Sequence, residues 1–324
     1  MTALNALSST PRLLLEAQLQ PAQGQRFQPT GFADLGPARF TGPDGSEMLL
    51  VESAQSVANR LEMAVYDPAT TEFIPELKGL PYVKVLGKNG QMLTSTILEA
   101  HRLNSPYVLE GSDKKIHTLL SEGFGNLSEG PVDFRVVAKI LFKIDPNSLL
   151  HGCFLEKLDG RLRITRALTG FIEAAGVNPA ESGGVKNDRV NQSGDTSGGY
   201  GNVPFSRTEF TATKLSAYFN IDLALLRGYG LPAEATELLI ALALLKVRRF
   251  LEGGLRLRTA CDLDVVDTRA TRPADFVIPT TSSLLQSCQS LIARCKPHFI
   301  DPAVTEVTYG QDITKKKKKD KSEA

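Results

Sequence analysis

The stretch 231–253, LPAEATELLIALALLKVRRFLEG, predicts a helix. Its middle, LLIALALL at 238–245, is apolar on every side, and a helix of that kind is buried in a protein core. Gly253 and Gly254 end the predicted helix. The residues that follow, LRLRTACDLDVVD at 255–267, alternate between apolar and polar side chains and predict a strand. A buried helix that leads into a half-buried strand indicates a domain of mixed α and β structure.

Further elements are predicted on the N-terminal side of this helix. Residues 12–20, RLLLEAQLQ, predict a first strand that Pro21 ends, and residues 49–67 predict a helix from apolar residues at three- and four-residue spacing. Residues 132–144 alternate and predict a half-buried strand, with a helix as the alternative. The remaining expectations are a short helix within 94–107 that stops before Pro106, a turn at 145–148, a hairpin over 151–165 around Asp159-Gly160, a helix over 166–175 that Gly176 stops, and a strand over 207–221.

This order predicts an α+β fold with a β-α-β-β-α-β-like plan and large insertions. Residues 70–130 are rich in glycine and proline, so we expect an irregular inserted subdomain with short strands there. Residues 1–314 would then form one domain, which also carries the glycine-rich loop 181–204.

The glycine-rich loop is the first candidate binding segment. Lys186, Asn187, Arg189 and Asn191 lie between its glycines, so cations and amides are carried on a permissive backbone. Successive N–H groups together with Lys and Arg side chains suit a polyanion such as RNA. The alternative is a surface loop without a ligand.

Three other polar groups suit contacts to sugar, phosphate or base faces. One surrounds Phe27 in the loop after the first strand, one is the polar side of the predicted 49–67 helix, and one lies near Pro106. The alternatives are an ordinary loop, a solvated helix face and a structural histidine. Together the candidate RNA-binding residues are Gln23, Gln25, Arg26, Gln28, Gln55, Asn59, Arg60, His101, Arg102, Asn104, Lys186, Asn187, Arg189, Asn191, Tyr200 and Arg207.

Charge limits where a polyanion could bind. The formal net charge is +1, but residues 315–324, KKKKKDKSEA, hold six lysines, so the rest of the chain is mildly acidic. Any polyanion site in the body must therefore be a local stripe. The lysine-rich end predicts a disordered tail, with nonspecific attraction to nucleic acid as the functional alternative.

Catalytic motifs are missing from the sequence. It contains no Walker A motif, no zinc-ligand spacing and no nucleophile elbow. Asp262 and Asp264 could share a strand face and hold a divalent metal for RNA cleavage, but Arg256 and Arg258 could pair with them instead. We therefore expect no enzyme activity, cofactor or metal ion, and keep a metal-dependent RNase as the alternative.

The cysteines and the apolar runs predict the cellular compartment of the protein. Cys153, Cys261, Cys288 and Cys295 show no C-x-x-C spacing, which favours buried thiols in a reducing cytoplasm. The first residues lack the features of a signal peptide, and the longest apolar run is far too short for a membrane span.

Seven stretches carry a family resemblance: 49–62 (LLVESAQSVANRLE), 97–107 (ILEAHRLNSPY), 145–152 (DPNSLLHG), 183–191 (GGVKNDRVN), 199–212 (GYGNVPFSRTEFTA), 218–230 (YFNIDLALLRGYG) and 250–263 (FLEGGLRLRTACDL). Together they resemble the backbone subunit of the type I-G (formerly I-U) CRISPR surveillance complex, a member of the RAMP superfamily. The resemblance runs from about residue 12 to residue 268. It does not extend to the lysine-rich tail, which the family pattern leaves unexplained.

The resemblance implies an RRM-like or ferredoxin-like palm with inserted thumb and finger regions. It implies that identical copies wind as a helical filament along one crRNA, which pairs with target DNA in antiviral defence. Other expected partners are the large subunit and the guide-processing subunit, and cutting belongs to a separate helicase–nuclease. Carried onto this chain, the Gln23–Gln28 loop, the polar side of the 49–67 helix, and Lys186, Asn187 and Arg189 would lie along the RNA.

Overall fold

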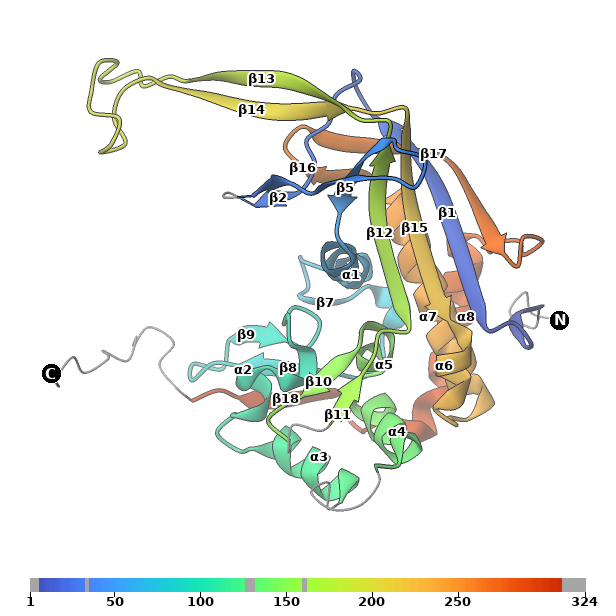
Figure 1. The fold of residues 1–324 in the computed structure, drawn as a ribbon. Helices are drawn as coiled ribbons and strands as arrows, with labels where there is room; N and C mark the ends of the chain where they lie inside the picture. Colours follow the sequence, from blue (N-terminus) through green and yellow to red (C-terminus); the bar gives the residue numbers. More distant parts are fainter. Residues whose placement is uncertain (1–5, 33–34, 126–131, 159–161, 311–324) are drawn as a thin grey trace, which may run out of the picture. The chain divides into compact units, whose positions relative to one another are not determined.

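The computed structural model describes residues 6–32, 35–125, 132–158 and 162–310 (Figure 1). The chain forms two compact units. The first contains Met1–Val65, Leu168–Ala224 and Ile240–Gln286, and the second contains Tyr66–Ala167, Leu225–Leu239 and Ser287–Ala324. None of the helices described combines the length and apolar character that a membrane crossing needs. All four cysteines are buried and unpaired.

The first unit is built on a seven-stranded antiparallel sheet. Its order is β16 (Leu255–Arg258), β17 (Cys261–Arg272), β1 (Arg12–Pro21), β15 (Lys214–Asp222), β12 (Leu168–Ala175), β5 (Glu47–Glu52) and β4 (Arg39–Thr41). The helix α1 (Ala54–Met63) lies between β1 and β12 in the chain, and α7 (Ala233–Glu252) lies between β15 and β17. These elements follow one another as β-α-β-β-α-β, and the predicted α+β fold is confirmed.

Alternation along the central strands places the core on one face of this sheet. Leu13, Leu15, Ala17 and Leu19 of β1 are all buried, while the residues between them are at least partly exposed. The register pairs each of the four with a buried residue of β15. Helix α1 packs against β12 on this buried face, where Gly170 lets the helix approach. The hydroxyl of Ser53 accepts a hydrogen bond from the Ser56 N–H and so begins α1.

A long two-stranded ribbon interrupts the hairpin between β12 and β15. Its strands are β13 (Asn178–Lys186) and β14 (Val203–Thr211), paired from Asn178 with Thr211 to Lys186 with Val203. Gly176, at a φ of +60°, precedes the ribbon, which turns away from β12 and β15 in Figure 1. The small strands β2 (Gly31–Phe32) and β3 (Gly36–Pro37) also belong to the first unit.

The second unit combines a small mixed sheet with short helices. Strand β8 (Tyr82–Leu86) pairs in parallel with β18 (Val304–Thr308) and antiparallel with β9 (Met92–Ser95). Its other elements are β6 (Tyr66–Asp67), β7 (Glu72–Phe73), α2 (Pro106–Leu109), α3 (Lys115–Phe124), α4 (Phe134–Ile144), α5 (Asn147–His151), β10 (Cys153–Leu155) and β11 (Leu162–Ile164). Two further helices, α6 (Leu223–Gly228) and α8 (Thr281–Cys295), contribute residues to both units.

Several predicted elements are confirmed. The strand at 12–20 is β1 and the buried helix at 231–253 is α7. The single strand predicted over 255–267 is instead a hairpin of two strands, β16 and β17, which turns at Ala260 with its φ of +61°. The pairing of Cys153 with Ile164 confirms the hairpin over 151–165, although its Asp159-Gly160 turn lies outside the described residues.

Two segments were assigned the wrong type of structure. The strand predicted over 132–144 is the helix α4, which Asp133 caps by accepting a hydrogen bond from the Arg135 N–H. Its buried residues, Val137, Ala138, Leu141, Phe142 and Ile144, follow helical spacing. The helix predicted over 166–175 is the strand β12, because pairing with β15 and β5 on both sides outweighs the helix propensity of its alanines.

Other boundaries also differ from the prediction. The helix predicted over 49–67 is preceded by β5 and covers only Ala54–Met63, and the strand predicted over 207–221 is split between β14 and β15. Part of the glycine-rich loop 181–204 is the strand β13. The short helix predicted within 94–107 is only the 3₁₀ turn η3 (Arg102–Asn104), which ends before Pro106 as expected. Pro106 then begins the next helix, α2, at a position where its missing N–H costs nothing. The predicted turn at 145–148 leads into α5.

We expect Gly170→Ala to lower the free energy of unfolding by about 1–3 kcal/mol. A Cβ atom there would lie 2.7 Å from Cδ1 of Phe219 and 3.0 Å from Cγ1 of Val57. Urea unfolding would measure the change. Gly228→Ala is the matched control, because no atom lies within 4 Å of a Cβ at that position. Equal stability of the two variants would contradict this view of how α1 packs on the sheet.

Candidate nucleic-acid interface

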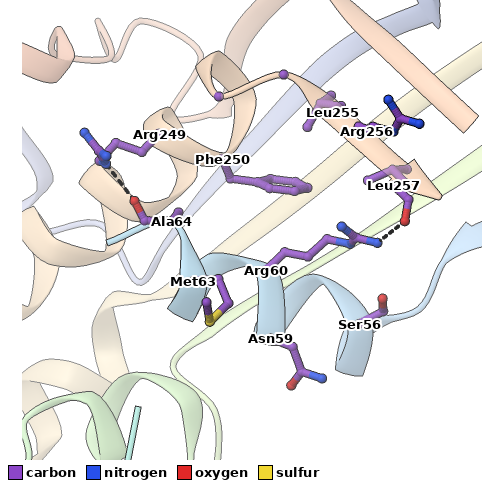
Figure 2. Close-up of a pocket in the computed structure, with 12 residues that line it drawn as sticks. Ser56, Asn59, Arg60, Met63, Ala64, Arg249, Phe250, Leu255, Arg256 and Leu257 are labelled. Atoms are coloured by element: carbon purple, nitrogen blue, oxygen red, sulfur yellow. Dashed lines mark hydrogen bonds between the residues drawn. The ribbon is translucent and has the colours of Figure 1, made fainter. Parts of the chain in front are cut away.

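A fully buried carboxylate, Glu52, holds two arginines at one end of the sheet. Glu52 is the last residue of β5 and its side chain is closed to solvent. Arg60 of α1 donates to Glu52 Oε1 at 3.0 Å, and Arg258 of β16 donates to the same oxygen. Arg60 also donates to the carbonyl of Leu257, as Figure 2 shows. A buried charge requires such partners, so Glu52 fixes both guanidinium groups.

A second buried carboxylate, Glu209, repeats this arrangement at the base of the ribbon. Arg207 lies two residues before it on the same face of β14 and donates to Oε1 at 2.6 Å. Arg26, in the loop after β1, lies 3.4 Å from Oε2. The carboxylate is about 5% exposed, whereas the Arg26 side chain is 54% exposed and the Arg207 side chain 30%. The arginines therefore keep surface that a ligand can reach.

Gln28 connects the two carboxylate sites. Its backbone carbonyl accepts from Arg258 Nη1 at 2.9 Å, and its side-chain oxygen accepts from Arg207 Nη1 at 3.3 Å. The loop is held by Phe27, which exchanges two backbone hydrogen bonds of 2.9 Å with Phe210. We call Arg26, Arg60, Arg207 and Arg258 the arginine cluster. Its four cations face two carboxylates, which leaves an excess of positive charge.

Three polar atoms in and beside the arginine cluster are buried without a hydrogen-bond partner among the described residues. Nε of Arg60 and Nε of Arg207 are buried, and neither has a hydrogen-bond partner in the described structure. Oε2 of Glu52 is also buried and has no hydrogen-bond partner in the described structure. Buried polar atoms are normally paired, and such exceptions commonly mark a ligand or water position.

The ribbon carries a second set of candidate residues at its end. Lys186, Asn187, Arg189, Asn191 and Tyr200 are all exposed on or beside the loop that joins β13 to β14. Asp188 organises this loop, because its carboxylate accepts from the N–H groups of Val190 at 2.8 Å, Asn191 at 3.1 Å and Gly201 at 2.8 Å. The loop is therefore held by specific hydrogen bonds while its cations remain free to meet a polyanion.

The remaining candidates of the first unit are exposed. Gln23 and Gln25 are exposed in the same loop as Arg26. On α1, Gln55 Nε2 donates to Asn59 Oδ1 at 2.9 Å, and both side chains are exposed. They extend the polar surface beside the arginine cluster.

The candidates of the second unit have different environments. Arg102 is buried, adopts a φ of +50° and donates to the Gly152 carbonyl at 3.4 Å. Asn104 Oδ1 accepts from the Lys157 N–H at 3.4 Å, and His101 is exposed. The hydrogen bond of Arg102 with Gly152 indicates a structural role for this buried guanidinium. Of these three residues, His101 has the most accessible side chain.

The acidic strand offers little to a metal ion. Asp262 pairs with Arg256 at 3.7 Å, across the β16–β17 hairpin. Arg258 instead turns to Glu52 and Gln28, because a bulge lies between Arg256 and Arg258. Within the described ranges, no group of three His, Cys, Asp or Glu side chains is positioned to hold a metal ion.

Sequence reasoning missed the residues that organise the arginine cluster. Glu52, Glu209 and Arg258 were not among the candidates, although their partners Arg60, Arg207 and Gln28 were. One usable signal is the pair Arg207 and Glu209, two residues apart in a strand and thus on one face. Arg258, the second partner of Glu52, lies 206 residues away in the chain, too far for any local pattern to reveal it.

We expect the ribbon loop to loosen in acid. Hydrogen bonds from the N–H groups of Gly201, Asn191 and Val190 hold the pKa of Asp188 below its ordinary value of 3.8. Because the folded state has the lower pKa, this stabilisation is complete above pH 3.8 and is lost as the pH falls through the folded value. Amide hydrogen exchange at Gly201 would measure it, with Asp188→Asn as the control that lacks the titration. Protection that stays constant in acid would contradict the role of Asp188.

Comparisons with known proteins bear on the family. A family model described as CRISPR-associated protein GSU0053 matches residues 13–179, more than half of the 324-residue chain. No curated protein matches the sequence.

Solved structures show only distant likeness. A chain of a CRISPR RNA-guided surveillance complex in a pre-nicking state is 14% identical over 74% of this chain and 71% of that chain, with a TM-score of 0.40. A chain of a further CRISPR RNA-guided surveillance complex is 14% identical over 88% and 83%, with a TM-score of 0.36. Csc2 of Thermofilum pendens is 12% identical over 89% and 76%, with a TM-score of 0.31. The family conclusion rests on the match over residues 13–179 alone: the chain belongs to the CRISPR-associated protein GSU0053 family.

Proposed function

We propose that this protein is the crRNA-binding backbone subunit of a type I, Cascade-type surveillance complex, and that it acts without catalysis. The observation that carries the proposal is the arginine cluster, in which two buried carboxylates orient four guanidinium groups. In this role the chain oligomerises along the guide RNA, and the guide pairs with target DNA. The large subunit and the guide-processing subunit are its further partners.

The chemistry of the cluster suits an RNA backbone. Arginine presents a planar set of N–H donors that matches phosphate, and its charge persists at any physiological pH. Phosphate contacts position a strand without reading its bases, which a subunit that accepts any guide sequence requires. The body outside 315–324 is mildly acidic, so a local cluster of this kind can hold a strand without general attraction to nucleic acid.

The same geometry supports a structural rather than an enzymatic role. Asp262 is engaged with Arg256, Asp264 is exposed on β17, and the described residues place no third ligand beside them. Two-metal and single-metal nucleases need several carboxylates around one position. We therefore place the function in binding and assembly.

Replacing Arg60 and Arg207 together with alanine should weaken RNA binding for all sequences alike. Two lost phosphate contacts would flatten the slope of log affinity against log salt by about 1.4, at about 0.7 per contact to a single strand. Fluorescence anisotropy of a labelled RNA over a salt series measures this slope. The control is Arg12→Ala with Arg39→Ala, since these exposed arginines pair with Asp222 and Glu47 outside the cluster. An equal effect of both double variants would remove the cluster from the RNA path.

Assembly gives a separate test. One copy has few cations for a long polyanion, so a long guide requires several copies, each covering an equal stretch. Head-to-tail contacts that do not close on themselves produce helical filaments. Native mass spectrometry with RNAs of increasing length should therefore show mass rising in equal steps, one protein for each fixed increment of RNA. A single copy that saturates long RNA would contradict the backbone role even if RNA binding survives.

A further inference from the structure

Helices α1 and α7 pack on the same face of the seven-stranded sheet. Val57 of α1 meets Gly170 of β12, and the ring of Phe250 in α7 lies 6.2 Å, between centroids, from that of Phe219 in β15. Side chains alternate along a strand, so the residues between these buried positions point to the opposite face. We call it the open face. Its middle consists of Glu16 and Gln18 of β1, Phe171 and Glu173 of β12, Lys214, Ser216 and Tyr218 of β15, and Asp267 and Arg269 of β17.

An aromatic pair lies at the centre of the open face. Phe171 and Tyr218 are directly opposite each other in the pairing of β12 with β15, and their ring centroids are 5.2 Å apart. Both side chains are half-buried. Aromatic side chains that stay partly in water on a sheet are typical of protein interfaces, where a partner covers them.

Glu173 lies two residues after Phe171 on the same face and has no cation. It is half-buried, and burial raises the pKa of its carboxyl above the ordinary value of 4.5. Directly opposite, the buried hydroxyl of Ser216 has no hydrogen-bond partner among the described residues. Removing a carboxylate from water without a cation is unfavourable. A cation brought by a partner would therefore stabilise Glu173.

The cations of the open face are already engaged. Lys214 donates to Oε1 of Glu16 at 2.9 Å, and Arg269 donates to Oε2 at 3.1 Å. Asp267, which is exposed, adds a further carboxylate beside them. Three carboxylates thus face two cations in the middle of this face, which disfavours a phosphate strand. The open face instead suits a partner with positive charge and apolar side chains.

Helix α4 has a surface with these complementary properties. Val136, Lys139 and Lys143 are all exposed and follow helical spacing on one side of the helix. Val136 is 41% exposed. Neither lysine forms an ion pair with a described residue, and no other described helix exposes two such lysines. We call these three residues the α4 stripe.

The dimensions of α4 fit the open face. Its 11 residues form a helix about 16 Å long, at about 1.5 Å per residue. Neighbouring strands lie about 4.8 Å apart, so the helix crosses about three strands, namely β12, β15 and β1. The two lysines are one turn apart and can face Glu173 together, with Val136 over the aromatic pair.

We propose that the open face of one copy receives the α4 stripe of the next copy, with both lysines against Glu173. The proposal rests on the proposed assembly along RNA and names the surfaces that join neighbouring copies. Because the two surfaces differ, the contact is head-to-tail and does not close on itself. One short helix covers only part of the about 1,200–2,000 Å² that stable interfaces bury. The contact therefore joins copies that the same RNA already holds close together.

An exchange of charges tests this pairing in the full-length protein. The sheet variant is Glu173→Lys, and the helix variant is Lys139→Glu with Lys143→Glu. These residues lie outside the arginine cluster, so both variants should bind an oligouridylate too short for two copies with wild-type affinity. On a long oligouridylate, native mass spectrometry should show that each variant needs about tenfold more protein than the wild type to fill the strand.

An equimolar mixture of the two variants should restore wild-type filling of the long strand. In the mixture, each contact between unlike copies pairs opposite charges again, either in the original order or exchanged. The controls are Glu156→Lys and the double variant Lys78→Glu with Lys296→Glu, which change the net charge equally at exposed positions of the second unit. Both controls should fill the long strand as the wild type does.

The outcomes separate this interface from the proposed function. A wild-type protein that binds neither strand, or never places a second copy on the long one, overturns the proposed function. Where the wild type fills the long strand, wild-type filling by either variant, an equal loss in the controls, or a mixture without recovery overturns only the interface. If Glu173→Lys does not bind the short strand, Glu173→Gln replaces it, because it removes the charge and keeps the shape. Wild-type filling by Glu173→Gln would then overturn the interface.

Discussion

The burial of Glu52 and Glu209 is the constraint on which the first unit depends. A carboxylate removed from water needs charged partners, and removing one partner leaves an uncompensated charge inside the protein. Here the partners come from four separate segments: the loop after β1, helix α1, strand β14 and strand β16. The two carboxylates thereby require these segments to meet, and Gln28 links one carboxylate site to the other.

This requirement also prepares the surface for a ligand. A free arginine loses rotamer freedom when it binds a phosphate, which reduces the net gain. An arginine already held by a buried carboxylate has lost much of that freedom during folding. The cluster can thus combine modest total charge with oriented donors, which agrees with a body that is slightly acidic overall. In the proposed function, the folding of the unit and its binding of RNA depend on the same ion pairs.

Local sequence patterns predicted correctly the elements whose apolar residues fit only one type of secondary structure. β1 and α7 were predicted because one alternates and the other is apolar all round. α4 was predicted wrongly, because residues 132–144 are apolar at so many positions that both a strand and a helix can bury them. The identity of β12 as a strand depends on partners 39 to 53 residues later and 120 to 127 residues earlier in the chain, which no window contains. The same limit applies to the interface. Glu209 is only two residues from Arg207, but the contacts of Arg258 with Glu52 and of Arg207 with Gln28 join segments more than 170 residues apart and become apparent only when these segments meet.

The ribbon of β13 and β14 interrupts a hairpin whose own strands, β12 and β15, remain paired with each other from Leu168 to Ala175. Its length can therefore change during evolution without altering the register of the sheet. One residue added to each strand would turn every side chain beyond it to the opposite face of the ribbon, whereas two would restore the pattern. Because β13 is exposed or half-buried along its whole length, the ribbon itself tolerates either change, and the added length decides only which way the residues at its tip point.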